Sequence, residues 1–336
     1  MGHLWVRASR LLTWFLLGVL VTVISSGCFQ GDRAEESPPS TINTNCFAVA
    51  HAVGETCVPY QAERIATLDG VSFENAVALG LQPIATVNLA FTELLLAEQL
   101  SNSTNIGDYN APNLERVLQL APDLILGLEE QQSVYSQAAQ IAPTVLVPFE
   151  HSGEWKEIFT FTADALGRAE QAQAVMAAYN ERSQAFQQTI MANLPPQNEG
   201  RLPTISVVRL FPDGITLYTK VGFIGTVLED VALPRPPSQD LNMAETVAIA
   251  GDTIQYTITK ESFEQADADA IFIIVGSWDD RIKDVLAELK ADPLWSKLAA
   301  VQQGNVYEVG DHWVGSGPIA ANAVIDDLFK YLIEEN

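Results

Sequence analysis

The sequence predicts an α/β protein with two lobes of mainly parallel sheet, joined by one long helix. Two observations predict this class. Short apolar runs alternate with helical segments over residues 46–150, and again over 197–336. That order is typical of parallel sheets covered by helices. Between them, residues 151–196 carry apolar side chains at helical spacing and no strand signal.

The first lobe alternates strand and helix along its whole length. Ser72 is a candidate N-cap for its first helix, and Pro112 suits the first turn of a later one. Short apolar runs bounded by turn residues predict strands over 64–68, 84–87, 124–126 and 144–147. The segments between them predict helices over 72–79, 91–100, 112–120 and 131–141.

The second lobe repeats this alternation of strands and helices after Pro195-Pro196. The triplet Pro212-Asp213-Gly214 predicts a turn between two adjacent strands. We expect strands over 204–210, 215–219, 271–275 and 306–309, and helices over 222–231, 280–289, 293–301 and 318–333.

The N-terminus has the features of a secretory signal. Arg7 and Arg10 precede an apolar stretch, 11–24, that is too short to span a membrane and ends in small residues before Cys28. A cysteine at that place indicates a lipoprotein box, although Ser25 stands where such boxes usually carry leucine. We expect residues 1–27 to be cleaved, Cys28 to be lipidated and 28–45 to form a flexible tether. An ordinary cleaved signal is the alternative.

The charge of the chain excludes some partners. The formal net charge is −24, and loss of residues 1–27, which carry two arginines and no acid, makes it −26 over the remaining 309 residues. So acidic a body offers no basic stripe for nucleic acid and is repelled by anionic lipid. Membrane association therefore depends on the lipid anchor.

Two cysteines remain after Cys28 is assigned to lipid. Cys46 and Cys57 flank a short apolar segment with a central Gly54, a pattern that fits a hairpin. In an oxidising compartment we expect them to form a disulfide. Two free buried thiols are the alternative, whereas a zinc site lacks a fourth ligand.

Six short phrases stand in order along the chain: Pro112-Asn113-Leu114-Glu115, Ala121-Pro122-Asp123-Leu124-Ile125-Leu126, Val207-Val208-Arg209, Leu217-Tyr218-Thr219-Lys220, Asp292-Pro293-Leu294-Trp295 and Gly304-Asn305-Val306-Tyr307. Together they resemble the iron-siderophore branch of the ABC-importer substrate-binding proteins whose two lobes are joined by a helical strut. The resemblance covers about residues 46–334. It implies two α/β lobes, one long connecting helix, little hinge bending and a ligand held in the cleft between the lobes.

The candidate ligand contacts lie at predicted strand ends, where open α/β lobes bind ligands. Arg209 closes an apolar strand, so it either binds ligand oxygens through its planar fork or forms a structural ion pair. Aromatic residues offer flat walls and single donors. According to the resemblance, Tyr109 occupies the turn before the Pro112-Asn113-Leu114-Glu115 phrase, where relatives that bind ferric hydroxamates often carry arginine. The other candidates are Tyr218, Trp278, His312 and Trp313.

The resemblance also implies partners. One exposed glutamate per lobe, Glu115 and Glu261, would dock arginines of an ABC permease dimer that works with its ATPase. We expect a monomer that is lipid-anchored to the cytoplasmic membrane on its extracytoplasmic side. The ferric siderophore is the transported ligand, and no cofactor or enzymatic activity is expected.

Three alternatives stay open. The same fold also carries haem or cobalamin, and His312 or Tyr109 is a candidate axial ligand for haem. Direct capture of a metal ion needs several converging ligands, but the histidines left after cleavage, His51, His151 and His312, are far apart in the predicted order. A hydrolase would need Asp311, His312 and Ser316 to converge, which residues so close in sequence seldom do.

Overall fold

The computed structural model describes residues 45–89, 93–194, 200–276 and 279–334. The expected leader, Cys28, nearly all of the expected tether, and Trp278 lie outside the described residues. No helix in the described part of the chain is both long and apolar enough to cross a membrane.

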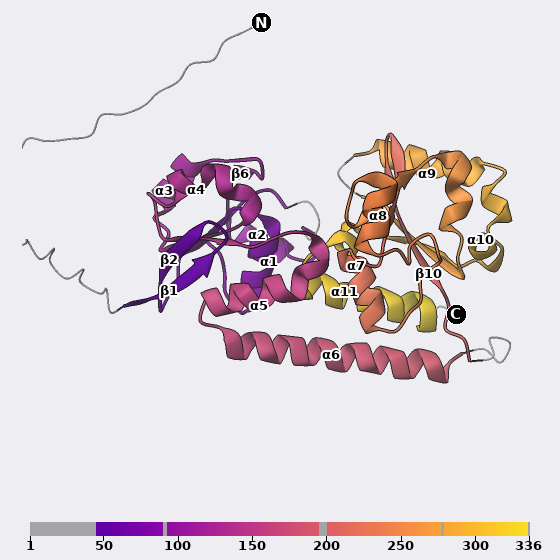
Figure 1. Cartoon of the computed structure of the whole chain (residues 1–336), viewed down its shortest axis with the longest axis horizontal. Coiled ribbons are helices and arrows are strands. Elements are labelled where there is room, and N and C mark those ends of the chain that lie inside the picture. Colours follow the sequence, from indigo (N-terminus) through magenta and orange to yellow (C-terminus); the bar gives the residue numbers. More distant parts are fainter. Residues whose placement is uncertain (1–44, 90–92, 195–199, 277–278, 335–336) are drawn as a thin grey trace, which may run out of the picture. The chain divides into compact units, whose positions relative to one another are not determined.

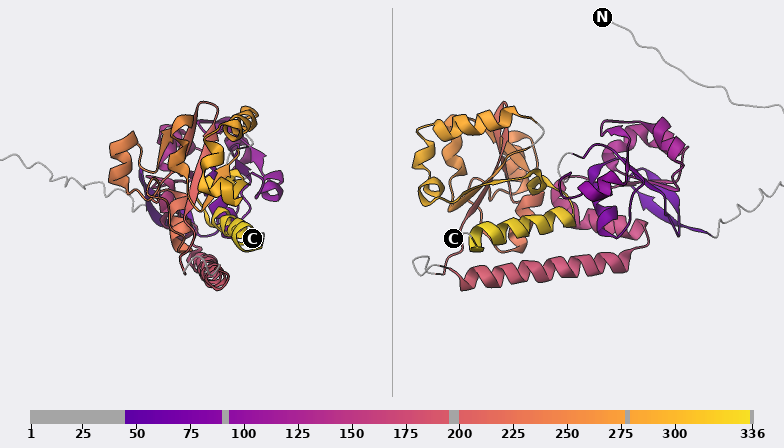
Figure 2. Two further views of the ribbon diagram at one scale, coloured as in Figure 1. Left: turned by 90° about the vertical axis from the view of Figure 1, so that its right-hand side faces the viewer. Right: turned by 180° about the vertical axis from the view of Figure 1, so that it is seen from behind.

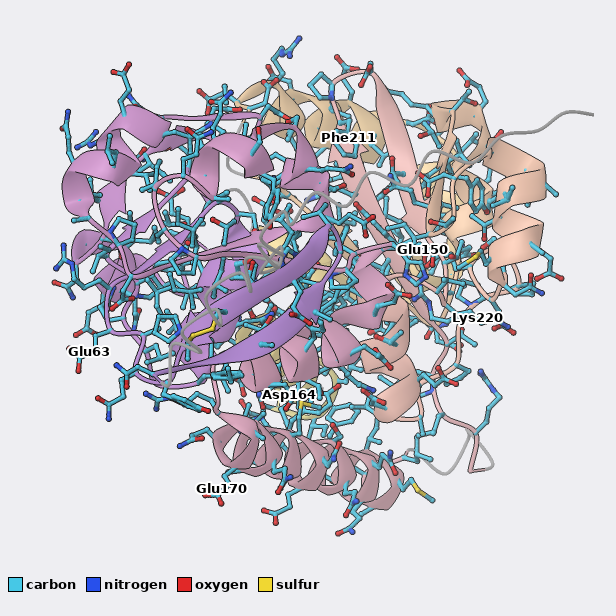
Figure 3. All side chains as sticks on the ribbon, turned by 60° about the vertical axis from the view of Figure 1, so that its left-hand side comes forward. Glu63, Glu150, Asp164, Glu170, Phe211 and Lys220 are labelled. Carbon is cyan, nitrogen blue, oxygen red and sulfur yellow. A yellow bond between two sulfur atoms is a disulfide. The ribbon has the colours of Figure 1, made fainter. Side chains whose placement is uncertain are left out.

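The described chain begins with a β-hairpin. β1 (Cys46–His51) pairs antiparallel with β2 (Gly54–Pro59), and Ala48 lies opposite Cys57. A disulfide joins Cys46 to Cys57, whose Cα atoms are 5.5 Å apart, and it is the yellow bond on the hairpin in Figure 3. The hairpin is held on the first lobe because the Thr56 hydroxyl donates to the carbonyl of Thr144 at 2.8 Å.

The first sheet is parallel throughout its described strands. Their order is β5 (Thr104–Asn105), β4 (Ala85–Thr86), β3 (Ile65–Thr67), β8 (Leu124–Leu128) and β9 (Thr144–Val147). The strands are short; β3, β8 and β9 are mainly apolar and buried along their whole length, whereas the edge strand β5 is polar. Helices α1 (Gly70–Ala78), α2 (Ala97–Ser101), α3 (Leu114–Leu120) and α4 (Gln132–Ala138) connect them.

Local details differ from the expectations at three helix starts. Asp69, and not Ser72, is the N-cap of α1, because its carboxylate accepts from the Ser72 amide at 2.7 Å. Pro112 pairs in the short antiparallel ladder of β6 (Gly107–Asp108) and β7 (Ala111–Pro112), so Asn113 caps α3 instead. α2 begins at Ala97, later than the pattern predicted.

The second sheet is mixed. Its described order is β12 (Gln255–Ile258), β11 (Gly214–Tyr218), β10 (Ile205–Phe211), β13 (Ala270–Ile274) and β14 (Val306–Val309). β10, β13 and β14 run parallel, whereas the turn after Phe211 brings β11 back antiparallel. The described helices of this lobe are α7 (Phe223–Asp230), α8 (Met243–Ala250), α9 (Arg281–Ala291), α10 (Ala299–Gln303) and α11 (Pro318–Phe329).

Two helices separate the sheets in the sequence, and the second is the long helix that the sequence predicts. α5 (Trp155–Ala165) ends before Gly167, whose φ of +63° breaks the helical path. α6 (Ala169–Ala192) spans 24 residues, about 36 Å at 1.5 Å per residue. In Figures 1 and 2 it runs alongside α5 and α11, both of which it contacts.

Aromatic packing fixes α6 against the second lobe. The rings of Phe186 and Phe329 meet edge to face with centroids 5.1 Å apart. The Tyr179 hydroxyl donates to Asp230 of α7 at 2.7 Å, and its ring packs edge to face on Trp155 of α5. Because side chains of α5, α6 and α7 belong to one hydrophobic cluster, α6 packs tightly against both neighbouring helices and is more than a linker between them.

Candidate functional site

Residues of both lobes line a cavity of about 520 Å³. This volume lies within the range of small-molecule sites. The residues of the first lobe follow the carboxyl ends of its strands: Asp69 and Gly70 after β3, Asn88 after β4, and Glu130 after β8. Since parallel strands bring these ends to one edge of the sheet, the topology itself assembles this wall.

The second lobe supplies the opposite wall. Arg209 lies on β10, and Tyr218 is the last residue of β11. Phe223 and Ile224 begin α7. Three of the predicted contacts in this lobe, Arg209, Tyr218 and Trp313, thus line the same cavity as Tyr109 of the first lobe.

Arg209 lines the cavity and also forms an ion pair. Its side chain is 9% exposed, as is that of Asp311, and its Nη2 lies 3.3 Å from Asp311 Oδ1. Nη1 lies 3.5 Å from the Tyr218 hydroxyl, and the guanidinium carbon lies 4.9 Å from the centre of the Phe211 ring. The two interpretations that the sequence left open for Arg209, ligand contact and structural ion pair, are therefore compatible.

Both cavity tyrosines are held protonated. Burial raises the pKa of Tyr218, and the carboxylates of Asp252 and Asp311 add to this while Arg209 opposes it. Burial also raises the pKa of Tyr109, whose hydroxyl donates to the Glu130 carboxylate. Each therefore offers a neutral phenol beside the cavity.

Trp313 and His312 have surroundings that differ from those expected. The Trp313 side chain is fully buried, stacks on Phe272 with centroids 4.4 Å apart and donates from Nε1 to Asp327 at 2.8 Å. Trp313 nevertheless lines the cavity, together with Val314, Gly315 and Ser316 of the same loop. The His312 Nε2 lies 2.9 Å from the same Asp327 carboxylate. His312 is absent from the described cavity lining.

Asp69 is a buried acid at the cavity wall. It is 1% exposed and accepts hydrogen bonds from the Ser72 amide and, at 2.8 Å, from the Ser72 hydroxyl. Burial raises its pKa to about 6, although the hydrogen bonds it accepts act in the opposite direction. It is therefore ionised at neutral pH and anchored to the start of α1.

Glu74 connects the lobes. It lies on α1 of the first lobe, is 2% exposed and accepts a hydrogen bond from the Ala320 amide of α11 at 2.8 Å. A Cβ at position 317 would lie 2.5 Å from Glu74 Oε1, so only glycine allows this approach. Burial raises the pKa of Glu74 to about 7. The carboxyl group caps the N-terminus of α11 and also lines the cavity.

The two predicted docking glutamates are exposed and lie away from the described cavity lining. Glu115 is in the first turn of α3. Glu261 is in the first turn of the 3₁₀ segment Lys260–Ala266, where a hydrogen bond from the Thr259 side chain lowers its pKa. Both are thus accessible to a protein partner.

The polar residues of the 311–316 loop bond to different partners. Asp311 pairs with Arg209, His312 with Asp327, and the Ser316 hydroxyl donates to the carbonyl of Gly315 at 2.7 Å. Within the described residues, no group of three or more His, Cys, Asp or Glu side chains is arranged to hold a metal ion.

Sequence reasoning missed three acids of the cavity. Asp69 and Glu130 follow β3 and β8, so the strand-end rule that selected Arg209 was sufficient to find them. Glu74 carries no such signal, because it lies inside a helix and its burial depends on α11, 246 residues away in sequence.

Comparison with known proteins gives consistent matches. A family described as "Periplasmic binding protein" matches residues 65–312. The probable siderophore-binding lipoprotein YfiY of Bacillus subtilis is 29% identical over 95% of this chain and 96% of its own length. The Fe(3+)-citrate-binding protein YfmC of Bacillus subtilis is 25% identical over 91% of each chain. The structure of Staphylococcus aureus SirA complexed with staphyloferrin B superposes with a TM-score of 0.72 at 26% identity, covering 85% of this chain and 98% of that one.

Proposed function

Because the chain belongs to the periplasmic binding protein family, we propose that it is the substrate-binding component of an ABC importer and captures a ferric siderophore outside the cytoplasm. The observation that carries the proposal is the cavity of about 520 Å³ lined by both lobes. A siderophore as the cargo is supported by the name of YfiY, a probable siderophore-binding lipoprotein, and by the staphyloferrin B bound to SirA.

The cavity lining suits such a cargo. A ferric siderophore has its iron already coordinated, so it needs no protein ligand to the metal and presents oxygens and apolar surface instead. Arg209 supplies a planar fork of donors, and the phenols of Tyr109 and Tyr218 add neutral donors. Phe223 and Leu89 supply apolar contact. The protein thus binds and carries its ligand without acting on it chemically, and we propose no enzymatic activity.

We propose that Cys28 carries the lipid that retains the protein at the outer face of the cytoplasmic membrane. YfiY is named a lipoprotein, which supports this location. We expect Cys28→Ala to abolish incorporation of a labelled fatty acid and to release a folded protein from membranes. A wild-type protein that takes up no label contradicts the anchor.

Delivery to the permease involves Glu115 and Glu261 in this proposal. Both are exposed acids at helix starts, one in each lobe, and are available to arginines of a permease dimer. A monomer presents one copy of each. The ATPase acts on the permease and needs no contact with this chain.

The test is a ligand titration by intrinsic tryptophan fluorescence. The panel contains ferric hydroxamates, ferric catecholates, ferric citrate, haem and cobalamin, with each metal-free siderophore as a matched control. We expect saturable quenching by at least one ferric siderophore and weaker binding of its metal-free form. Saturable binding of haem or cobalamin, with no response to any ferric siderophore, would refute the proposal.

A further inference from the structure

The charges around the cavity constrain the cargo further. Resting on the proposed function, we propose that this site prefers ferric complexes with neutral or positive net charge over polyanionic carboxylate or catecholate complexes.

Acids outnumber cations at the cavity. Asp69 and Glu130 line it, as does Glu74, whose pKa of about 7 leaves it partly protonated at neutral pH. Among the described lining residues Arg209 is the only lysine or arginine. The undescribed residues 90–92 and 277–278 add no cation, because their sequences are Ala-Phe-Thr and Ser-Trp. The sum is therefore acidic on any assignment of those segments.

The positive charge of Arg209 is already compensated. Asp311 lies 3.3 Å from it, and both side chains are 9% exposed, so little solvent screens the pair. Asp252 also acts on the neighbouring Tyr218. A ligand anion would have to compete with Asp311 for the guanidinium, whereas a ligand carbonyl oxygen needs only one of its N–H groups.

The nearest lysine on the adjoining segment is engaged elsewhere. Lys220 follows β11, but its Nζ lies 3.0 Å from Asp240, and Lys220 is absent from the described lining. Tyr109 bonds to Glu130 and so adds a neutral donor in place of a charge. The described lining therefore offers polar groups for hydrogen bonding, including Asn88 and Gln255, and a single cation, Arg209. A second arginine, Arg235, lies behind Tyr218 and donates to its carbonyl at 2.7 Å, but it is absent from the described lining.

The size of the effect follows from Coulomb's law. One carboxylate within about 8 Å of a unit charge changes its affinity by about tenfold in a partly buried site, after screening. A net charge of −24 on the chain adds a long-range field that slows the approach of anions. A complex with several negative charges is repelled by the cavity carboxylates and by the long-range field of the chain, whereas a neutral complex is repelled by neither.

The experiment compares ligands that differ in charge. Ferric desferrioxamine B is cationic, ferrichrome is neutral, and ferric citrate and ferric enterobactin are anionic. Dissociation constants are measured by fluorescence quenching at low and at high salt. We expect the cationic or the neutral complex to bind at least tenfold more tightly than both anionic complexes, with salt narrowing the gap.

One substitution tests the origin of the preference. Glu130 is exposed and accepts a bond from Tyr109, so Glu130→Gln keeps an acceptor and removes a charge. We expect it to weaken the cationic complex by about five- to tenfold and to leave ferrichrome within twofold. Glu129→Gln is the matched control, since Glu129 is exposed, adjacent and absent from the described lining.

The outcomes separate the two proposals. The charge preference is overturned if an anionic complex binds most tightly. It is also overturned if the affinities depend neither on ligand charge nor on Glu130→Gln. Both results leave the proposed siderophore function intact. Binding of none of the four ferric complexes, while haem or cobalamin binds, overturns the function itself. An equal effect of Glu129→Gln and Glu130→Gln also overturns the assignment, because it attributes the preference to the general field.

Discussion

Burial of the Glu74 carboxyl group at the contact between the lobes links pH to stability. We consider the substitution Glu74→Gln, which keeps an oxygen that accepts from the Ala320 amide and removes the ionisable group. Burial raises the pKa of Glu74 from an ordinary 4.5 to about 7. The folded protein therefore keeps a proton that the unfolded chain releases.

The sign and the magnitude follow from linkage. Where the folded state binds more protons, stability falls as pH rises. The contribution of Glu74 is fully present below pH 4.5 and is lost as pH rises through about 7. A shift of this size corresponds to about 3 kcal/mol. The same change in pH leaves the side-chain amide of the Glu74→Gln variant unaffected.

Urea unfolding of both proteins at several pH values between 4.5 and 8 tests this. We expect the free energy of unfolding of Glu74→Gln, relative to wild type, to rise by about 3 kcal/mol across this range. Glu63→Gln is the control, because Glu63 is exposed on the first lobe, as Figure 3 shows. A difference between Glu74→Gln and wild type that stays constant with pH would refute the reasoning.

Three further predictions concern other sites. Arg209→Ala should weaken binding of the ferric siderophore by about tenfold or more. It should also lower the free energy of unfolding by about 3 kcal/mol, because it removes the ion-pair partner of the buried Asp311. A fluorescence titration and a melting curve measure the two effects, and an unchanged affinity would show that Arg209 does not contact the ligand. Glu115→Ala and Glu261→Ala should leave the dissociation constant unchanged yet reduce uptake by cells, so a tenfold loss of affinity in either variant disproves its docking role. Reducing the hairpin disulfide with dithiothreitol should lower the free energy of unfolding by about 2–3 kcal/mol, measured in urea; no change means that the closed loop adds nothing.

The sequence was sufficient for the fold because the central sheet strands are short, mainly apolar and bounded by turn residues. The predicted strands 144–147 and 306–309 coincide with β9 and β14. α8 and β12 were missed. β12 is an edge strand with only partial burial, so its apolar pattern is weak. The helix expected over 293–301 breaks into a 3₁₀ turn and α10.

The predicted contacts that lie along one cavity are those whose positions depend on their own strands. Arg209, Tyr218 and Tyr109 lie at or near strand ends, and all three line the cavity. Trp313 lines the same cavity, and its indole also donates to Asp327 of α11 and stacks on Phe272. Those partners are set by the packing of a helix on a sheet, which no local pattern encodes.

The position of Glu74 connects ligand binding to the arrangement of the lobes. Its carboxyl group lines the cavity and at the same time accepts from the first turn of α11. α11 in turn packs on α6, so the contact reaches the long helix through one intervening helix. If the lobes rotate relative to each other, either this buried hydrogen bond breaks or α1 and α11 move as one unit. Because an unsatisfied buried carboxyl group is costly, movement of α1 and α11 as one unit is favoured, and we expect little hinge bending between the lobes.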